Sequence, residues 1–294
     1  MSTILAGVMM MTALVQATDT TIAVEEGMRL SVRNREGEIR VTTWQRDAVR
    51  IVASNGEAIR IDAERSGSVL RVRTSVRVEW DDVEYRRRRR SDRGDDGSVD
   101  FVITVPAYLD VELSGVETDM SVVGTAGDVS VETVDGDVVI RGGRGFIHAR
   151  SHDGELRVEG ASGEIEVDAS SGGIWISDVN GDVAAESVNG DIELRNIDGR
   201  RVTARTVNGG VTFSGAVHDG GRYQLSTHDG DVTASIPEGT NATVSVANFN
   251  GDFETRFPIL LRGGAGYKFD FTLGDGSAVL VLEAFSGDVL LRRR

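Results

Sequence analysis

Residues 127–154 read GDVSVETVDGDVVIRGGRGFIHARSHDG, and the spacing of their glycines decides the fold. Glycine returns every nine residues here, and the same interval continues to residue 199. The second and fourth residues after each glycine up to residue 190 are apolar, as in Val129 and Val131. Side chains two apart point to one face of a β-strand, so each unit is predicted to be a short strand followed by a turn. The turn glycines are Gly127, Gly136, Gly145, Gly154, Gly163, Gly172, Gly181, Gly190 and Gly199, with Gly209, Gly230, Gly251 and Gly287 at looser intervals.

A longer period of 18 residues is superimposed on the period of nine. The turns TVDG at 133–136 and SHDG at 151–154 are of one type, and the turn between them differs. Two strands and two turns therefore make one repeat, which buries its apolar face only by stacking on its neighbours. We predict an all-β fold, a β-solenoid with coils of about 18 residues. The alternative is a meander of hairpins, in which each strand pairs with its sequence neighbours.

The glycine intervals lengthen after residue 199, to 10, 21, 21 and 36 residues. We expect the coils to stack in sequence order up to the C-terminus, with two coils in the last interval. The final strand would then lie at an open edge. There, the charges of Arg292, Arg293 and Arg294 would discourage pairing with another molecule.

Residues 18–108 alternate apolar and polar side chains in short runs, such as 29–33 and 69–73, but lack the strict period. We predict a β-rich cap here, made of wider coils or a small sheet, and assign 109–294 to the solenoid repeats. The segment 81–98, DDVEYRRRRRSDRGDDGS, interrupts the cap with charges and no apolar periodicity, which predicts a mobile loop.

The N-terminus has the features of a targeting segment. Residues 4–15, ILAGVMMMTALV, form an apolar run that is too short to span a bilayer but typical of a signal-peptide core, and VQA at 15–17 suits cleavage. The usual positive charge is missing, since no charged residue precedes Asp19. We assign 1–17 to a signal peptide cleaved near Ala17. The mature chain is then expected outside the cytoplasm, in the periplasm or beyond, with no transmembrane span.

The composition argues against several classes of protein. The 294 residues include 36 glycines and no cysteine, and the net charge is −15. Disulfides, cysteine-ligated metals and a lipid-bearing N-terminal cysteine are therefore not expected, and a strongly acidic chain is a poor nucleic-acid binder. With 39% hydrophobic residues, the chain has enough apolar side chains for a packed core.

Several short motifs occur in order along the chain. They are VRNREGEIRV at 32–41 followed by Trp44, VP at 105–106, the recurrent Thr/Ser-Val-Asp/Asn-Gly-Asp turns, and SGDV at 286–289. On these motifs the chain resembles the bacterial putative-adhesin family of β-strand-repeat proteins. The resemblance implies a right-handed β-helix-like fold and a location in the cell envelope, and it assigns no catalytic residue.

Acidic residues follow most of the turn glycines, interrupted at Phe146 and Gly173. Stacked carboxylates in turns can bind Ca²⁺, but calcium-binding nonapeptide repeats have paired glycines and an Asp at a fixed later offset, which this chain lacks. Asp and Asn are also preferred in tight turns. We therefore predict turn chemistry and no cofactor, with Ca²⁺ binding as the alternative. The acidic residues are Asp128, Asp137, Glu155, Glu164, Asp182, Asp191, Asp231, Asp252 and Asp288.

One strong basic cluster occurs in the sequence: Arg86, Arg87, Arg88, Arg89 and Arg90. It is a candidate for contact with an anionic polymer of the envelope. Neighbouring aspartates neutralise much of its charge, so a solvated loop is the simpler interpretation.

The four histidines are His148, His152, His218 and His228. His152 and His228 share a turn position about four coils apart, too far for one metal ion. His148 lies at an outward strand position, and we expect neither metal binding nor catalysis from any of the four.

The sequence has no nucleophile elbow, phosphate-binding loop or zinc-binding helix motif. We predict a non-catalytic, adhesin-like protein that presents a long polar face to another component of the cell envelope, a protein or a glycan. Two alternatives stay open. One is a structural element that self-associates; the other is a carbohydrate-active β-helix enzyme, for which short coils leave little room for a cleft.

Overall fold

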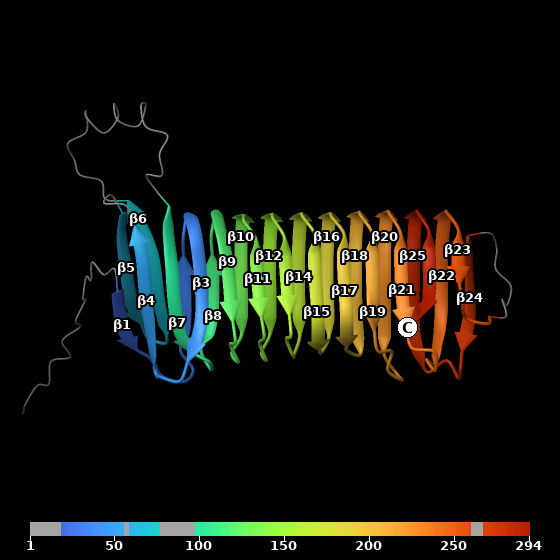
Figure 1. The fold of residues 1–294 in the computed structure, drawn as a ribbon, viewed down its shortest axis with the longest axis horizontal. Helices are drawn as coiled ribbons and strands as arrows, with labels where there is room; N and C mark the ends of the chain where they lie inside the picture. The colour runs from blue at the N-terminus through green and yellow to red at the C-terminus, as the bar shows by residue number, and fades with distance from the viewer. Residues whose placement is uncertain (1–18, 56–58, 77–97, 260–266) are drawn as a thin grey trace, which may run out of the picture.

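The computed structural model describes residues 19–55, 59–76, 98–259 and 267–294. These residues form 26 β-strands stacked into a rod (Figure 1). Within these ranges no helix is long and apolar enough to cross a membrane. The predicted signal peptide and the charged segment up to residue 97 lie outside the described residues.

The strands form two rows that run along the rod, and each regular coil contributes one strand to each row. The first row, in spatial order, is β5 (Ile59–Ser66), β6 (Val69–Val76), β2 (Arg29–Arg33), β8 (Asp110–Ser114), β10 (Val129–Asp135), β12 (Ile147–Asp153), β14 (Ile165–Ser171), β16 (Val183–Asn189), β18 (Arg201–Asn208), β20 (Arg222–Asp229), β25 (Ala278–Ser286), β22 (Ala242–Asn250) and β24 (Lys268–Leu273). The second row is β1 (Asp19–Ala23), β4 (Ala48–Asn55), β7 (Val99–Pro106), β3 (Glu36–Trp44), β9 (Glu117–Val123), β11 (Val138–Arg141), β13 (Leu156–Glu159), β15 (Ile174–Asn180), β17 (Ile192–Asp198), β19 (Val211–Gly215), β21 (Val232–Ile236), β26 (Val289–Arg293) and β23 (Phe253–Thr255). With half of the 26 strands in each row and a neighbour spacing of ~4.8 Å, the rod is about 58 Å long.

In the regular repeats, residues 18 apart in sequence lie side by side on parallel strands. Val129 of β10 pairs with Ile147 of β12, and Val138 of β11 pairs with Leu156 of β13. β10 and β11 follow one another in sequence but lie in different rows, so they are not the two arms of a hairpin. This pairing confirms the predicted solenoid and is incompatible with the meander.

The core lies between the two rows. Residues at the apolar positions of the repeat are buried, and the residues between them are half-buried or exposed. In the first row Val131, Ala149, Val167 and Ala185 are fully buried and stack directly on one another. A single coil has no core of its own, so this shared apolar column holds the coils together.

The N-terminal strands continue both rows without a break. β2 pairs with β8 and β3 with β9, and β6 and β7 add a further coil outside them. β5 then pairs antiparallel with β6, while β4 pairs antiparallel with both β7 and β1. The cap expected from the sequence is therefore a set of antiparallel strands that ends the parallel stack.

The last coils do not stack in sequence order, so this prediction is wrong. β25 and β26 lie between the coil of β20 and β21 and the coil of β22 and β23. β24 pairs antiparallel with the outer side of β22 and ends the first row. In the inserted position, β25 has a hydrogen-bonded neighbour on each side. This suits its sequence, which is continuously apolar over 278–282 (AVLVL).

The final strand, β26, is not the edge strand of its row, and that prediction is wrong for the same reason. β26 pairs with β21 along its whole length and with β23 up to Leu291, so Arg292 and Arg293 pair with β21 alone; the Arg294 amide donates a hydrogen bond to the Ile236 carbonyl. Among the residues that the structure describes, the outermost strand of the first row at this end is β24, whose exposed Lys268 and Asp270 supply the charges at the edge.

Candidate binding surfaces

The turn glycines form two lines along the rod. The first line, in spatial order, is Gly136, Gly154, Gly172, Gly190, Gly209, Gly230, Gly287 and Gly251, and the second is Gly127, Gly145, Gly163, Gly181 and Gly199. A Cβ added at Gly154 would collide with the carbonyl oxygen of Gly136, and one at Gly199 with that of Gly181. Gly154 has a φ of 145°, whereas Gly199 has no positive φ. The sequence explains the turn glycines only by the positive φ that tight turns need. The structure adds a second reason, the close approach of successive coils, and this reason applies to both Gly154 and Gly199.

Aspartates that follow the turn position join several coils to the next. An oxygen of Asp119 accepts a hydrogen bond from the Asp137 amide at 2.9 Å, and Asp137 accepts one from the Glu155 amide at 2.7 Å. Asp191 accepts the Gly210 amide in the same way at 2.7 Å. These side chains therefore have a structural role. Because Gly173 has no side chain, it interrupts the series.

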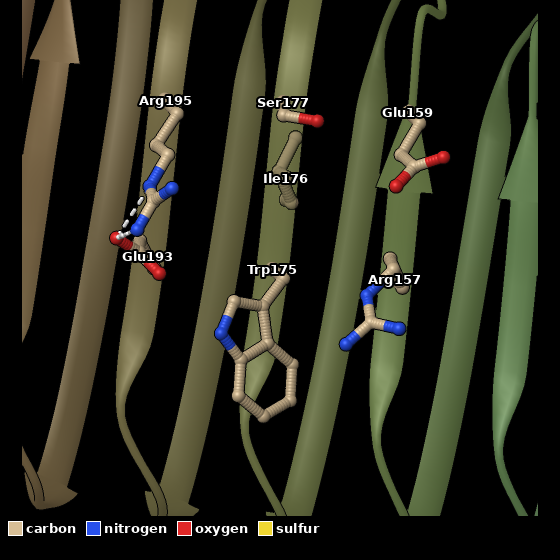
Figure 2. A pocket seen from close by; sticks show the side chains of 7 residues that line it. All are labelled: Arg157, Glu159, Trp175, Ile176, Ser177, Glu193 and Arg195. Carbon is tan, nitrogen blue, oxygen red and sulfur yellow. Dashed lines mark hydrogen bonds and ion pairs between the residues drawn. The ribbon is translucent and has the colours of Figure 1, made fainter.

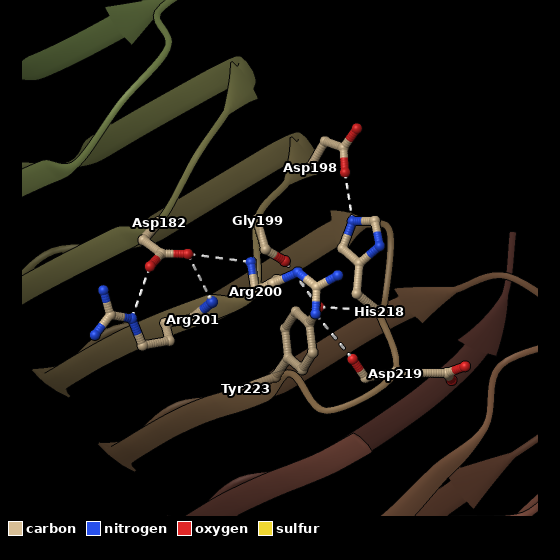
Figure 3. Close-up of polar contacts among 8 residues, drawn as sticks. All are labelled: Asp182, Asp198, Gly199, Arg200, Arg201, His218, Asp219 and Tyr223. Carbon is tan, nitrogen blue, oxygen red and sulfur yellow. Dashed lines mark hydrogen bonds and ion pairs between the residues drawn. The ribbon is translucent and has the colours of Figure 1, made fainter. Parts of the chain in front are cut away.

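One extra residue near Arg200 creates a local polar network (Figure 3). Asp182 accepts hydrogen bonds from the amides of Arg200 and Arg201 and from Nε of Arg201 at 2.7 Å. Burial raises the pKa of Asp182, but the hydrogen bonds from the Arg201 side chain and from the two amides outweigh burial, and the net pKa is lowered. The network anchors the irregular turn, with its polar groups paired within the chain.

Tyr223 lies at the buried side of the same network (Figure 3). Its hydroxyl donates a hydrogen bond to the Gly199 carbonyl at 2.8 Å and accepts one from the His218 amide at 2.9 Å. Burial raises the pKa of Tyr223. The His218 ring contacts the Asp198 carboxylate, so His218 has an acidic partner within the chain.

His148 lies on the outward face of β12, as predicted, and belongs to a cluster that the sequence reasoning missed. Ligand atoms of His148, Glu166 and Asp168 lie within 4.8 Å of one another. Asp168, however, is paired with Arg150 at 3.1 Å, and Nδ1 of His148 is 3.8 Å from Glu166. The 18-residue spacing of His148 and Glu166 is the signal that would have brought them together.

Four aromatic side chains form an exposed stack at one corner of the coils, which we name the aromatic column: His228, Phe285, Phe249 and Tyr267. Ring centres are 4.6 Å apart between His228 and Phe285, 5.0 Å between Phe285 and Phe249, and 4.7 Å between Phe249 and Tyr267. Phe249 is 52% exposed, Tyr267 53% and Phe285 42%. The column is therefore an apolar surface patch made of contiguous rings.

The aromatic column continues a line of corner positions along the first row, which is mostly apolar but holds His152 and Ser170 in two coils. Its first three residues lie two positions before a turn glycine, and the same slot in other coils holds Val134, Val188 and Val207, all exposed. A groove of about 540 Å³ runs beside this edge, with Val188, Val207 and His228 among its lining residues. The slot was visible in the sequence, but the contact between Phe249 and Phe285 was not, because it depends on the inserted coil.

A half-buried aromatic residue lies on the opposite row. Trp175 of β15 lines a shallow pocket of about 310 Å³ together with Arg157, Glu159, Glu193 and Arg195 (Figure 2). The guanidinium carbon of Arg157 is 5.4 Å from the centre of the indole ring. Sequence reasoning passed over Trp175 because it occupies an ordinary outward strand position.

The predicted basic cluster, Arg86, Arg87, Arg88, Arg89 and Arg90, lies outside the described residues. Its contact with an anionic polymer, and Ca²⁺ binding at the turns, remain predictions.

The fold and its turns define the class of protein: a two-row β-solenoid whose coils are joined at glycine turns. The chain belongs to the Toastrack DUF4097 family, whose profile matches residues 29–292. This membership agrees with the family resemblance inferred from the sequence motifs.

Two solved structures are similar to the chain over most of their length. A "putative cell adhesion protein" from Clostridium sporogenes ATCC 15579 has 10% sequence identity and a TM-score of 0.24, with 94% of this chain and 99% of that chain covered. A "putative adhesin" from Bacteroides fragilis NCTC 9343 has 12% identity and a TM-score of 0.42, with 94% and 96% covered. A search of curated proteins finds no match to the chain.

Proposed function

We propose that the protein is a non-catalytic binding protein of the bacterial cell envelope and that it docks another envelope protein through the aromatic column. The observation that carries the proposal is the exposure of four contiguous rings on a rigid rod. Contiguous exposed apolar patches mark interaction sites, and aromatic side chains are enriched at the centres of protein interfaces.

The chemistry of the column favours a protein partner. The rings of His228, Phe285 and Phe249 stack on one another with interplanar angles of 14° and 12°, so their faces are largely used within the column. What they present outward is ring edges, together with the exposed side chain of Tyr267. An apolar pocket of a partner protein is complementary to such a surface, and rings already held in place lose little conformational entropy on binding.

Stacking inside the column also stabilises the coil corners, by about 0.5–1.5 kcal/mol per ring pair. Stability does not require rings here, because the same slot holds Ser170 in the coil of β14 and Val188 in the next coil. A coil corner built with serine or valine therefore exists in this chain, and the choice of phenylalanine at two successive corners is better explained by binding.

The location outside the cytoplasm is part of the proposal. It rests on the apolar run 4–15, on the cleavage pattern ending at Ala17, and on the family resemblance. N-terminal sequencing of the protein isolated from its native cells tests it: a mature chain that starts near Thr18 is expected, and recovery of the protein in the cytoplasm with residues 1–17 intact contradicts it.

The docking test measures retention of the purified mature protein on isolated native envelopes. Replacing Phe249, Tyr267 and Phe285 together by Ser, the residue that occupies the slot of Phe249 and Phe285 in the coil of β14, is expected to weaken retention at least about 10-fold. The matched control replaces Val134, Val188 and Val207 by Ser on the same edge and is expected to bind like the wild type.

Three results discriminate between the explanations. Wild-type retention by the aromatic-column variant contradicts the proposal. Loss of retention only when the five arginines from Arg86 to Arg90 become Ser would assign binding to the basic cluster instead. A concentration-dependent dimer in light scattering that the aromatic-column variant abolishes would make a second copy of the chain the partner. Circular dichroism melts show whether each variant is folded.

A further inference from the structure

We propose that Trp175 is a platform for a neutral pyranose ring, so that the second row carries a glycan-binding site. This site is separate from the aromatic column, since Trp175 lies on β15 in the second row and the column lies at a corner of the first row. The inference therefore does not depend on the proposed docking of a protein.

The indole ring lies over the backbone of Gly173. A Cβ added at Gly173 would collide with the six-membered ring of Trp175, at 2.6 Å from Cζ3 and 2.8 Å from Cζ2. In the view of Figure 2 the ring is seen nearly face-on above the strands. One face of the indole is thus turned to the backbone, and the other faces the open pocket, as a stacking platform requires.

Residue 173 differs from the residues at the equivalent position of neighbouring coils, and the difference makes room for the indole ring. The equivalent positions in neighbouring coils hold Asp137, Glu155 and Asp191, and Asp137 and Asp191 each accept an amide hydrogen bond from the coil that follows. With glycine at 173 the fold gives up such a contact, which is worth about 1 kcal/mol. What the chain gains is the space that lets the indole lie flat.

Polar groups of both signs surround the platform. Arg157 and Arg195 supply donors, and Glu159 and Glu193 supply acceptors, around the same shallow pocket. Arg195 Nε is 2.6 Å from Glu193, and Arg141 Nε is 2.9 Å from Glu159, so the carboxylates are held in place.

The charges within the pocket lining cancel. Two cations and two anions line it, which gives no attraction for a strongly anionic polymer but suits a ring whose hydroxyls both donate and accept hydrogen bonds. The apolar C–H face of a pyranose ring packs on an aromatic plane, and the equatorial hydroxyls then point toward the polar rim. The chemistry of the pocket therefore fits an uncharged sugar.

The test is saturation-transfer NMR on the purified mature protein with neutral tetrasaccharides of glucose, mannose, galactose and N-acetylglucosamine, and with tetragalacturonate as the anionic comparison. At least one neutral tetrasaccharide is expected to bind with a Kd of about 1 mM or tighter. Trp175→Ala is expected to weaken that binding at least about 10-fold.

Gly173→Asp is the sharper variant, because it keeps the indole and adds an acidic side chain beneath it. The equivalent positions 137 and 191 already hold Asp, so the backbone at this position of a coil tolerates that residue. It is expected to weaken binding as much as Trp175→Ala does. Trp44→Phe is the matched control: Trp44 donates to the Ala48 carbonyl, away from the pocket, and binding should be unchanged. The aromatic-column variant should also bind the sugar normally.

Three results would overturn the proposal: no neutral tetrasaccharide bound at about 5 mM, equal binding by wild type and Trp175→Ala, or a preference for tetragalacturonate over every neutral sugar. Each can occur whether or not the aromatic column retains the protein on envelopes, so the two proposals fail independently.

Discussion

Alanine substitutions at four glycines separate the two physical reasons for glycine in the turns. Gly154 has a positive φ and no room for a Cβ, and Gly199 has no room but an ordinary φ. Gly160 has a φ of 64° and open space, and Gly239 has open space and no positive φ. The four positions therefore form a complete two-by-two comparison within one chain.

The expected costs follow from the geometry. Forcing a methyl group into a packed contact costs about 1–3 kcal/mol, and holding alanine at positive φ costs about 1–2 kcal/mol. We expect the free energy of unfolding to fall by about 3 kcal/mol for Gly154→Ala, which combines both costs, by about 2 for Gly199→Ala and by about 1 for Gly160→Ala. Gly239→Ala should change it by less than about 0.5 kcal/mol.

Urea unfolding followed by circular dichroism measures these differences, with the slope of the transition showing whether each variant unfolds as the wild type does. Gly199→Ala is the decisive member of the set, because φ does not contribute to its cost. A loss at Gly199 no larger than at Gly239 would refute the claim that close approach of the coils selects glycine at the turns.

Two further predictions concern the carboxylates of the turns. Asp137→Ala should destabilise the protein by about 1 kcal/mol in urea unfolding, because the Glu155 amide loses its acceptor. Asp137→Asn keeps an acceptor oxygen and should cost less. Equal losses in the two variants would mean that the charge of Asp137, and not its hydrogen bond, stabilises the turn. Asp182 has a lowered pKa in the folded state, so the stability it contributes is present above its unfolded pKa of about 3.9 and is lost as pH falls through the lower folded pKa. The difference in Tm between wild type and Asp182→Asn should therefore be constant from about pH 7 to pH 5 and shrink below about pH 4, and a difference that grows toward acid pH would contradict the assignment.

The repeat itself could be predicted from the sequence because one rule operates at every coil. Apolar residues at fixed offsets from glycine, such as Ile147 and Ala149, specify which side chains face inward, and the 18-residue alternation of turns specifies which strands are neighbours. Both signals are local, and each coil repeats them. The fold class, the register and the buried face all follow from them.

The order of the last coils could not be predicted, because it is a long-range choice between equivalent edges. The coil of β20 and β21 can accept either following coil, since the strand at 242–250 and the strand at 278–286 have the same inward pattern. Which of these two strands lies next to β20 depends on the loops that connect the strands and on β24. The antiparallel pairing of β24 with β22 leaves no periodic pattern in the sequence.

The candidate surfaces were missed for related reasons. The aromatic column depends on that coil order, since Phe285 stacks between His228 and Phe249 only when β25 is inserted. The Trp175 platform depends on a side chain lying along its own strand over Gly173, which strand periodicity does not encode. Sequence reasoning noted Gly173 as an interruption but not as the floor of a pocket.

Site-specific photo-crosslinking in native envelopes tests the central claim, docking through the aromatic column, most directly. A benzophenone amino acid is placed in turn at Phe249, at Phe285, at Val134 on the same edge, and at Thr212 on the exposed face of the second row. The account predicts one light-dependent protein adduct shared by positions 249 and 285 and absent at 134 and 212. Adducts of equal yield at all four positions, or none at 249 and 285, would contradict it.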